Sequence, residues 1–391
     1  MIHSRYAKQR MIEDLSETMV FIGGPRQVGK TTLATTIGTA HYKYFSYLNW
    51  DSSEDRRAML AERFDPQARL LIFDELHKYR RWKQYVKGVY DTQKERFHIM
   101  VTGSARLDLY RRGGDSLMGR YHYYRLHPFS LAEILKSTSH PVPSRELTLQ
   151  RHASAVTHLE RLFSFGGFPE PFFKRDLRTL RRWQNERTDR LIKEDIRDLE
   201  HLRDLSAMQV LVELMPQKVG ALLSLNALRE DLQVTHKTIA LWMDVLERFY
   251  YHFRVYPYAT TAVKSLRKQA KAYLWDWSPI ADEGARFENL VASHLLKLVH
   301  WLHDAEGYTT DLFYLRDIEG REVDFLVTVN RKPWFAVEVK QSDTALHKPL
   351  LYFGERLRIP FLYQVVRQPN VDVLQGRVRI VSADTFLSAL Y

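Results

Sequence analysis

The chain has 391 residues, of which 45% are hydrophobic and 27% are charged, as in globular proteins of two or three domains. It contains no cysteine, which excludes disulfides, thiolate zinc sites and cysteine nucleophiles. The net charge of +11 indicates a polyanionic partner, although many basic proteins bind no nucleic acid. No apolar run approaches the ~18 residues that span a bilayer, and the start resembles no signal peptide, so we expect a cytoplasmic protein without membrane contact.

Residues 19–33 place a phosphate-binding loop between an apolar strand and a helix. Gly24 and Gly29 bracket four residues and precede Lys30 and Thr31, which matches the Walker A pattern G-x-x-x-x-G-K-[ST]. Glycines let backbone N–H groups surround a phosphate, and the start of a helix favours an anion. Lys30 would reach the β- and γ-phosphates of ATP, and the Thr31 hydroxyl would bind Mg²⁺. The residues expected to contact the nucleotide are Gly24, Pro25, Arg26, Gln27, Val28, Gly29, Lys30, Thr31 and Thr32.

A second motif follows downstream, where the apolar residues 70–73 lead into Asp74 and Glu75. This pattern is typical of a buried parallel strand that carries carboxylates at its C-terminal edge. In a P-loop NTPase, Asp74 would hold Mg²⁺ through water, and Glu75 would orient and deprotonate the attacking water. For either motif alone, a chance match in an ordinary strand and turn is the alternative, but the two motifs support each other.

Short apolar strands alternate with helices in the N-terminal part, which predicts a parallel α/β domain. The pattern predicts strands at 19–22, 44–48, 70–73, 98–102 and 121–126, with helices at 30–37 and around 82–93. Thr102 or Ser104, at the end of the fourth strand, is a candidate polar sensor of the γ-phosphate, and an ordinary turn is the alternative. Arg120 is a candidate arginine finger for a neighbouring subunit's nucleotide, or else a solvated loop arginine.

Residues 206–256 predict a small helical module. One amphipathic helix is followed by a second that Ser224 caps and, after a tight turn, by a third that Thr235 caps. Two short helices joined in this way are typical of a helix-turn-helix, and the strand-like residues 249–257 fit a wing. Few cations lie on the exposed face of the third helix, so a winged helix that joins domains or binds protein is the alternative to DNA binding.

The C-terminal part has a second αβ pattern, in which an amphipathic helix at 286–302 precedes several strands. Asp324, Glu338 and Lys340 are charged residues at strand positions where apolar ones are expected. If Asp324 lies opposite Glu338 or Lys340, the three converge on one face. Two carboxylates with a lysine could bind Mg²⁺ or Mn²⁺ and activate water against a phosphodiester, with Glu288 completing the metal shell. Periodicity alone favours the alternative, an exposed charged strand end.

Several stretches carry a family resemblance: 24–32, 71–77, 101–104, 116–120 and 166–170, then 286–291, 322–326 and 338–340. With these motifs the chain resembles, almost end to end, prokaryotic AAA+-like ATPases in which an AAA_14 domain is joined to a DUF4143 domain. The C-terminal motifs resemble the PD-(D/E)xK nuclease core. That resemblance implies metal-binding roles for Asp324, Glu338 and Glu288, and a catalytic role for Lys340. Such domains can also bind DNA without cutting it, and no proline precedes Asp324.

The expected fold class is α/β: an AAA+-like P-loop NTPase with a parallel sheet, a helical lid, a winged helix-turn-helix and a C-terminal restriction-endonuclease-like domain. The expected boundaries are 1–165, 166–205, 206–257 and 265–391. We expect a homo-oligomer that hydrolyses ATP with Mg²⁺, with DNA binding controlled by nucleotide state and a candidate Mg²⁺-dependent nuclease at the C-terminus. The alternative is an ATP-switched DNA-binding regulator or defence sensor with an inactive nuclease fold.

Overall fold

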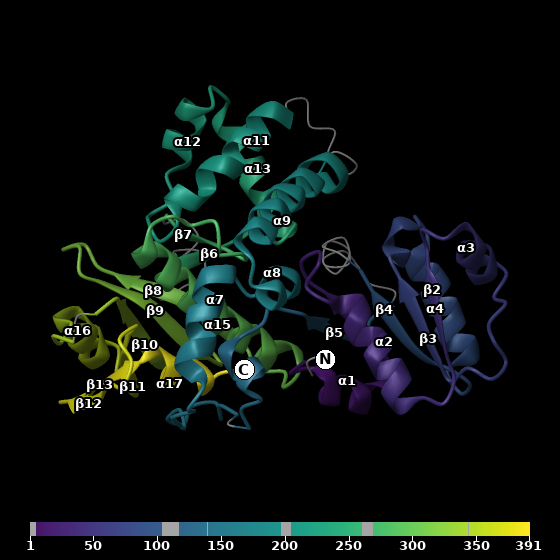
Figure 1. The fold of residues 1–391 in the computed structure, drawn as a ribbon, viewed down its shortest axis with the longest axis horizontal. Coiled ribbons are helices and arrows are strands. Elements are labelled where there is room, and N and C mark those ends of the chain that lie inside the picture. The colour runs from purple at the N-terminus through teal and green to yellow at the C-terminus, as the bar shows by residue number, and fades with distance from the viewer. Residues whose placement is uncertain (1–4, 104–116, 139, 197–204, 260–268, 343) are drawn as a thin grey trace. The chain divides into compact units, whose positions relative to one another are not determined.

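The computed structural model describes residues 5–103, 117–138, 140–196, 205–259, 269–342 and 344–391 (Figure 1). The chain forms two compact units, Met1–His127 and Pro128–Tyr391. Residues 128–165, which we expected in the ATPase domain, therefore group with the second unit. The reason is that the helices they form pack on helices near the C-terminus. Within these described ranges, no helix is both long and apolar enough to cross a membrane.

The first unit is a parallel sheet flanked by helices (Figure 1). Its strands are β1 (Met19–Gly23), β2 (Phe45–Asn49), β3 (Leu70–Asp74), β4 (His98–Thr102) and β5 (Tyr121–Arg125), in the order β2-β3-β4-β1-β5. Its helices are α1 (Lys8–Leu15), α2 (Lys30–His41), α3 (Ser53–Leu60) and α4 (Trp82–Gln93), with a 3₁₀ turn at Leu76–Lys78. All neighbouring strands are parallel, and each expected strand is present to within one residue at either end.

Parallel pairing brings the ends of β1, β3 and β4 to one edge of this sheet. Both β1 and β3 are buried along their whole length, as continuous apolar runs covered by helices should be. β1 leads into the nucleotide loop and α2, while β3 ends on Asp74, which pairs with Thr102 of β4. The register thus gathers the loop, Asp74 and Thr102 at the same edge, where ligands of open α/β sheets bind.

The second unit begins with helices. They are α6 (Leu131–Leu135), α7 (Ala155–Phe165), α8 (Pro169–Lys174), α9 (Leu177–Arg190), a π-helical stretch (Leu191–Ile196), α11 (Leu205–Leu214), a 3₁₀ turn (Met215–Lys218), α12 (Leu225–Asp231) and α13 (His236–Arg248). The Ser224 and Thr235 side chains accept hydrogen bonds from the N–H groups of Ala227 and Thr238. The two expected N-caps therefore start α12 and α13.

An eight-stranded sheet forms the rest of the second unit. Its strands are β6 (His252–Pro257), β7 (Lys271–Leu274), β8 (Thr310–Arg316), β9 (Glu322–Val329), β10 (Lys332–Lys340), β11 (Phe361–Val366), β12 (Asp372–Gln375) and β13 (Val378–Ser382), in the order β12-β13-β11-β10-β9-β8-β6-β7. The helices α15 (Glu283–Asp304), α16 (Lys348–Arg356) and α17 (Ala383–Ser388) accompany it. β8, β9 and β10 are antiparallel, whereas β10, β11 and β13 are parallel.

The hairpin that follows α13 is part of this sheet. β6 pairs with β7 in antiparallel fashion and with β8 in parallel through Tyr256 and Pro257. Leu222, before α12, forms a β-bridge to Lys271 at the start of β7. Three helices followed by a hairpin is the order expected of a winged helix, but here the hairpin is continuous with the C-terminal sheet. The same pairing brings Lys271 into the neighbourhood of β9.

A buried ion pair joins α6 to α15. Lys297 Nζ lies 2.6 Å from Glu133 Oε2 and 2.8 Å from Ser130 Oγ, and both charged side chains are 1% exposed. We expect Lys297→Met to lower the free energy of unfolding by about 3–5 kcal/mol, because the buried Glu133 carboxylate loses the ammonium group that lies 2.6 Å from it. Adding Glu133→Leu should recover part of the loss. Denaturant unfolding monitored by circular dichroism measures both, and an equal loss in the single and double variants would contradict this account.

Candidate functional site

The nucleotide loop adopts backbone conformations that its glycines permit. Gly24 has φ 132° and Gly29 has φ 99°, values that side chains with a Cβ disfavour. A Cβ on Gly24 would lie 2.5 Å from the carbonyl oxygen of Leu126, so the loop packs directly against the chain after β5. Gly29 is also the N-cap of α2. The first N–H groups of this helix are therefore available to an anion.

Lys30 lies inside this loop. It is 8% exposed, and its Nζ donates hydrogen bonds to the carbonyl oxygens of Gly24 at 3.0 Å and Pro25 at 2.7 Å. Phosphate oxygens are stronger acceptors for an ammonium group than peptide carbonyls are, since both partners are then charged. The loop thus holds its lysine where a phosphate can replace the carbonyls as its partner.

Asp74 gathers hydroxyl groups from three other elements. Its Oδ2 accepts hydrogen bonds from Thr31 of α2 at 2.8 Å and from Tyr47 of β2 at 2.7 Å, and its Oδ1 accepts a short one from Thr102 of β4. Burial, together with the hydrogen bond to Asp74, raises the pKa of Tyr47 above its ordinary value. A carboxylate adjacent to the Walker A hydroxyl is a donor set that fits Mg²⁺. Tyr47 was not predicted as a site residue, although its position near the end of β2 was an available signal.

Glu75 follows in a left-handed backbone conformation, with φ 56°. Its N–H donates to the Thr102 carbonyl at 3.1 Å. Its Oε2 lies 3.5 Å from Lys78 Nζ and 3.6 Å from His77 Nε2, and the side chain is 23% exposed. The candidate base is thus held directly after Asp74, the candidate Mg²⁺ ligand, and its side chain is partly exposed.

The structure places the candidate sensor Thr102 beside Asp74 and the candidate arginine finger Arg120 away from the nucleotide loop. Thr102 touches Asp74, whereas Ser104 lies outside the described residues. Arg120 precedes β5, whose first residue pairs with the first residue of β1, so it lies at the sheet edge opposite the nucleotide loop. It forms a two-pronged ion pair with Asp91 of α4, at 2.8 and 3.2 Å. A role for Arg120 toward a second subunit stays a prediction.

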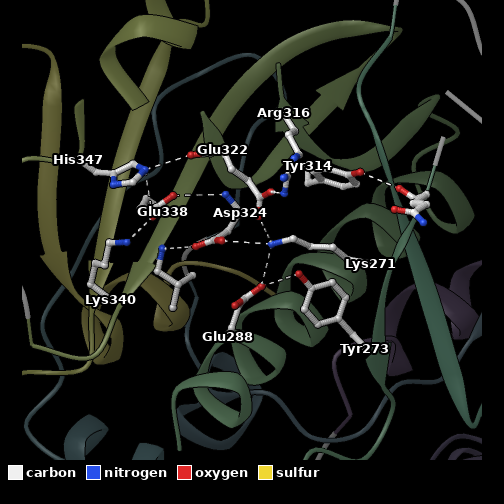
Figure 2. Close-up of polar contacts among 12 residues, drawn as sticks. Lys271, Tyr273, Glu288, Tyr314, Arg316, Glu322, Asp324, Glu338, Lys340 and His347 are labelled. Atoms are coloured by element: carbon white, nitrogen blue, oxygen red, sulfur yellow. Dashed lines mark hydrogen bonds and ion pairs between the residues drawn. The ribbon is translucent and has the colours of Figure 1, made fainter. Parts of the chain in front are cut away.

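A second polar cluster lies in the other unit, where β7, β9, β10 and α15 meet (Figure 2). The β9–β10 register pairs Phe325 with Val337, so Asp324 lies opposite Glu338. The Asp324 N–H donates to Glu338 Oε2 at 3.4 Å, and the Val339 N–H donates to Asp324 Oδ2 at 2.9 Å. This is the register that the nuclease hypothesis requires.

Glu338 is buried and has two further partners (Figure 2). Lys340 Nζ lies 2.6 Å from its Oε1, and His347 Nε2 lies 3.3 Å from the same atom. Burial and the charge of Asp324 raise the pKa of Glu338 to about 8. The structure thus brings Asp324, Glu338 and Lys340 together. His347 was missed because it lies at the start of α16, outside any strand motif.

Lys271, which was not predicted as a site residue, lies among the acidic side chains. Its Nζ is 2.6 Å from Glu322 Oε1, 3.4 Å from Glu288 Oε1 and 3.6 Å from Asp324 Oδ1 (Figure 2). Burial alone would lower the pKa of Lys271, but the surrounding carboxylates raise it. Glu288 also accepts a hydrogen bond from Tyr273 at 2.7 Å, and burial with the charge of Asp324 raises the pKa of Glu288 to about 7.

The metal site expected from Asp324, Glu338 and Glu288 is not formed. Across the described ranges, no three His, Asp or Glu side chains gather closely enough to hold a metal ion. The Lys271 ammonium contacts both Asp324 and Glu288, while Asp324 and Glu338 also accept backbone N–H groups. These residues do not fit a resident divalent ion. A metal-binding role for Asp324, Glu338 and Glu288 stays a prediction, which considered one hairpin and one helix and did not include the cation from β7.

Glu338 gives the folded protein a testable pH dependence. Its pKa is raised from 4.5 to about 8, so between these values the folded chain holds a proton that the unfolded chain has released. Because the folded state binds more protons, stability falls as the pH rises through this window. We expect Glu338→Gln to reduce the slope of unfolding free energy against pH in this window, while Glu288, whose pKa is raised to about 7, keeps its own contribution. Denaturant titrations across the window measure it, and parallel profiles for the two proteins would contradict it.

Comparison with known proteins identifies three segments. Residues 16–135 match AAA_14, an AAA domain, residues 156–281 match DUF8612, a domain of unknown function, and residues 283–385 match DUF4143, also a domain of unknown function. The AAA and DUF4143 domains expected from the resemblance are therefore present.

The similar curated proteins are uncharacterized. One from Mycobacterium tuberculosis is 23% identical over 399 residues, which cover 97% of this chain and 80% of that protein. One from Methanocaldococcus jannaschii is 24% identical over 298 residues, which cover 67% of this chain and 61% of that protein.

Two solved structures show a distant likeness. The Holliday junction branch migration motor RuvB of Thermotoga maritima has a TM-score of 0.31 and 17% identity, with 68% of this chain and 95% of that chain covered. The ORC1 protein of Aeropyrum pernix in complex with DNA has a TM-score of 0.32 and 12% identity, with 75% and 93% covered. Scores this low carry no argument about function.

Proposed function

We propose that this chain, in which an AAA-type P-loop domain precedes a DUF4143 domain, hydrolyses ATP to control its binding to DNA. The observation that supports ATP hydrolysis is that Lys30, Thr31 and Asp74 lie together at one edge of the sheet, where Thr31 Oγ1 is 2.8 Å from Asp74 Oδ2. Bound Mg²⁺ would neutralise charge on the phosphates as the γ-phosphoryl group is transferred to water.

Each residue of the site has a separate task in this proposal. The loop N–H groups and Lys30 hold the phosphates, and Thr31 with Asp74 holds the ion. Tyr47 and Thr102 donate hydrogen bonds that fix the Asp74 carboxylate in place. Glu75, one residue further on, takes the proton of the attacking water.

Binding and turnover should be separable by mutation. We expect Lys30→Ala to abolish or severely weaken ATP binding, because the loop loses the ammonium group that would form charged hydrogen bonds with the β- and γ-phosphates. Glu75→Gln should bind ATP normally and lower kcat by about 10²–10⁴-fold, the usual contribution of a general base. Fluorescent-nucleotide binding and phosphate release measure the two steps. Glu95→Gln, an exposed acid after α4, is the control, and a native turnover rate in Glu75→Gln would remove Glu75 from this role.

DNA binding is supported by the net charge of +11 of the whole chain and by exposed arginines on the second unit. At the end of α8 and along the first half of α9, the exposed arginines are Arg175, Arg178, Arg181 and Arg182. The intervening Asp176 accepts the Thr179 N–H as the α9 cap. On α13, His236 and Lys237 are exposed. The nearby Arg254 is paired with Asp244 of the same helix at 2.7 Å, so its charge is already neutralised. The α9 arginines are therefore the stronger candidates for phosphate contacts.

The salt dependence of DNA binding tests these contacts. Each phosphate contact contributes about −0.9 to the slope of log K against log salt, so Arg178→Ala with Arg182→Ala should reduce the magnitude of the slope by about 2. Lys332→Ala with Lys348→Ala removes the same charge from exposed positions elsewhere in the unit and should leave the slope unchanged. Fluorescence anisotropy with duplex DNA gives the slopes. Binding that is independent of salt, or absent at low salt, would contradict the nucleic-acid proposal.

The same assay tests coupling between the two activities. Glu75→Gln keeps ATP bound, so its DNA affinity with and without ATP isolates the effect of nucleotide occupancy. Equal affinities would mean that the sites are not coupled, whatever their separate activities.

Metal-dependent cleavage is the second candidate function. The direct opposition of Asp324 and Glu338, with Lys340 2.6 Å from Glu338, favours it. The position of Lys271 opposes it. Cleavage of plasmid DNA by pure protein with Mg²⁺ or Mn²⁺, lost in Asp324→Ala and Lys340→Ala, would select this candidate over the regulator with an inactive nuclease fold.

A further inference from the structure

Lys271 is the buried cation of an otherwise acidic cluster. Four carboxylates, those of Glu288, Glu322, Asp324 and Glu338, lie together around it and its neighbours (Figure 2). Among the residues that the structure describes, Arg316 lies 2.8 Å from Glu322 and Lys340 lies 2.6 Å from Glu338. Their side chains are 42% and 31% exposed, whereas that of Lys271 is 4% exposed. The charge that balances the interior of the cluster is therefore that of Lys271.

The main chain fixes where this ammonium lies. Lys271 is paired with Val255 of β6 and bridged to Leu222, so both sides of its backbone are held. Gly220 lies close to the carboxylate of Glu288, because a Cβ added at Gly220 would come within 3.1 Å of Glu288 Oε2. Glu288 is thus enclosed by the segment before α12 as well as by β7. Lys271 enters the cluster from β7, the last strand in the order of the sheet, and not from a surface loop.

We propose that the Lys271 ammonium is the resident cation of this cluster and that it closes the cluster to divalent metal ions. A Mg²⁺ shared by Asp324 and Glu288 would stand near 2.1 Å from an oxygen of each. Lys271 Nζ lies 3.6 and 3.4 Å from those same side chains, so the ion and the ammonium would compete for one space and repel each other. This inference holds whether or not the chain binds DNA.

Removal of the ammonium should turn the cluster into a metal site. In Lys271→Met the apolar stem remains and the carboxylates lose their cation, so we expect the melting temperature of the nucleotide-free protein to fall by roughly 5–10 °C. Millimolar MnCl₂ should restore most of this loss, because an ion that binds only the folded state stabilises it. Electron paramagnetic resonance of Mn²⁺ should show bound ion in Lys271→Met and none in the nucleotide-free parent protein.

Two variants separate this account from a general effect of losing a buried lysine. Lys271 contacts three carboxylates, the ligands that divalent ions favour. Lys297→Met also removes a buried ammonium, but the partners of Lys297 include one carboxylate, that of Glu133, with the Ser130 hydroxyl at 2.8 Å and the Pro128 carbonyl at 3.5 Å. It should lose stability without recovery in Mn²⁺. Adding Asp324→Asn to Lys271→Met should abolish the bound Mn²⁺ signal.

Three results would overturn the proposal. One is Mn²⁺ bound by the nucleotide-free parent protein and lost in Asp324→Asn, since the cluster would then accept metal with Lys271 present. A second is a folded Lys271→Met protein that binds no Mn²⁺. Should Lys271→Met fail to fold, Lys271→Gln replaces it, and failure of both to fold even with Mn²⁺ present would show that no ion substitutes for the ammonium, which also counts against the proposal.

Discussion

Parallel pairing of β1, β3 and β4 is the constraint on which the nucleotide site depends. Asp74 receives hydroxyl groups from Thr31, Tyr47 and Thr102, residues far apart in sequence that meet only because parallel strands end at one edge. The register pairs Asp74 with both Asn49 and Thr102. A slip of one residue would turn the carboxylate to the other face of the sheet. The chemistry of the loop therefore rests on strand register as much as on the Walker motifs.

The second unit is organised by a different requirement, the neutralisation of buried charge. Lys297 joins α15 to α6 through Glu133, and Lys271 joins β7 to β9 and to α15 through three carboxylates. A buried ion needs partners in defined positions, and both lysines find them on elements distant in sequence. These contacts add little net free energy compared with apolar packing, but they specify which elements meet.

Local sequence patterns predicted the first unit well and the acidic cluster only in part. The strands, the P-loop and Asp74 could be located because their signals lie within a few consecutive residues. Alternation along β10, with the register condition, also anticipated that Asp324 and Glu338 could converge. The role of Lys271 could not be anticipated, since it depends on which strands pair with each other. Similarly, α7 packs on α15 and α17, which lie more than a hundred residues further along the chain. This packing places the division between the compact units after His127, whereas the sequence suggested a boundary at residue 165.

β6 pairs both with the hairpin strand β7 and with β8 of the C-terminal sheet, and this determines where the chain can be cut into fragments that fold. β6 hydrogen-bonds to β7 on one side and to β8 on the other, so the helices α11 to α13 and the C-terminal sheet are two parts of one folding unit. A fragment that begins after β6 would leave β8 with an unpaired edge, and open strand edges recruit other chains into aggregates. The helical module and the sheet are thus best produced as one polypeptide, and the natural place to cut lies upstream, near the junction of the two compact units at His127 and Pro128.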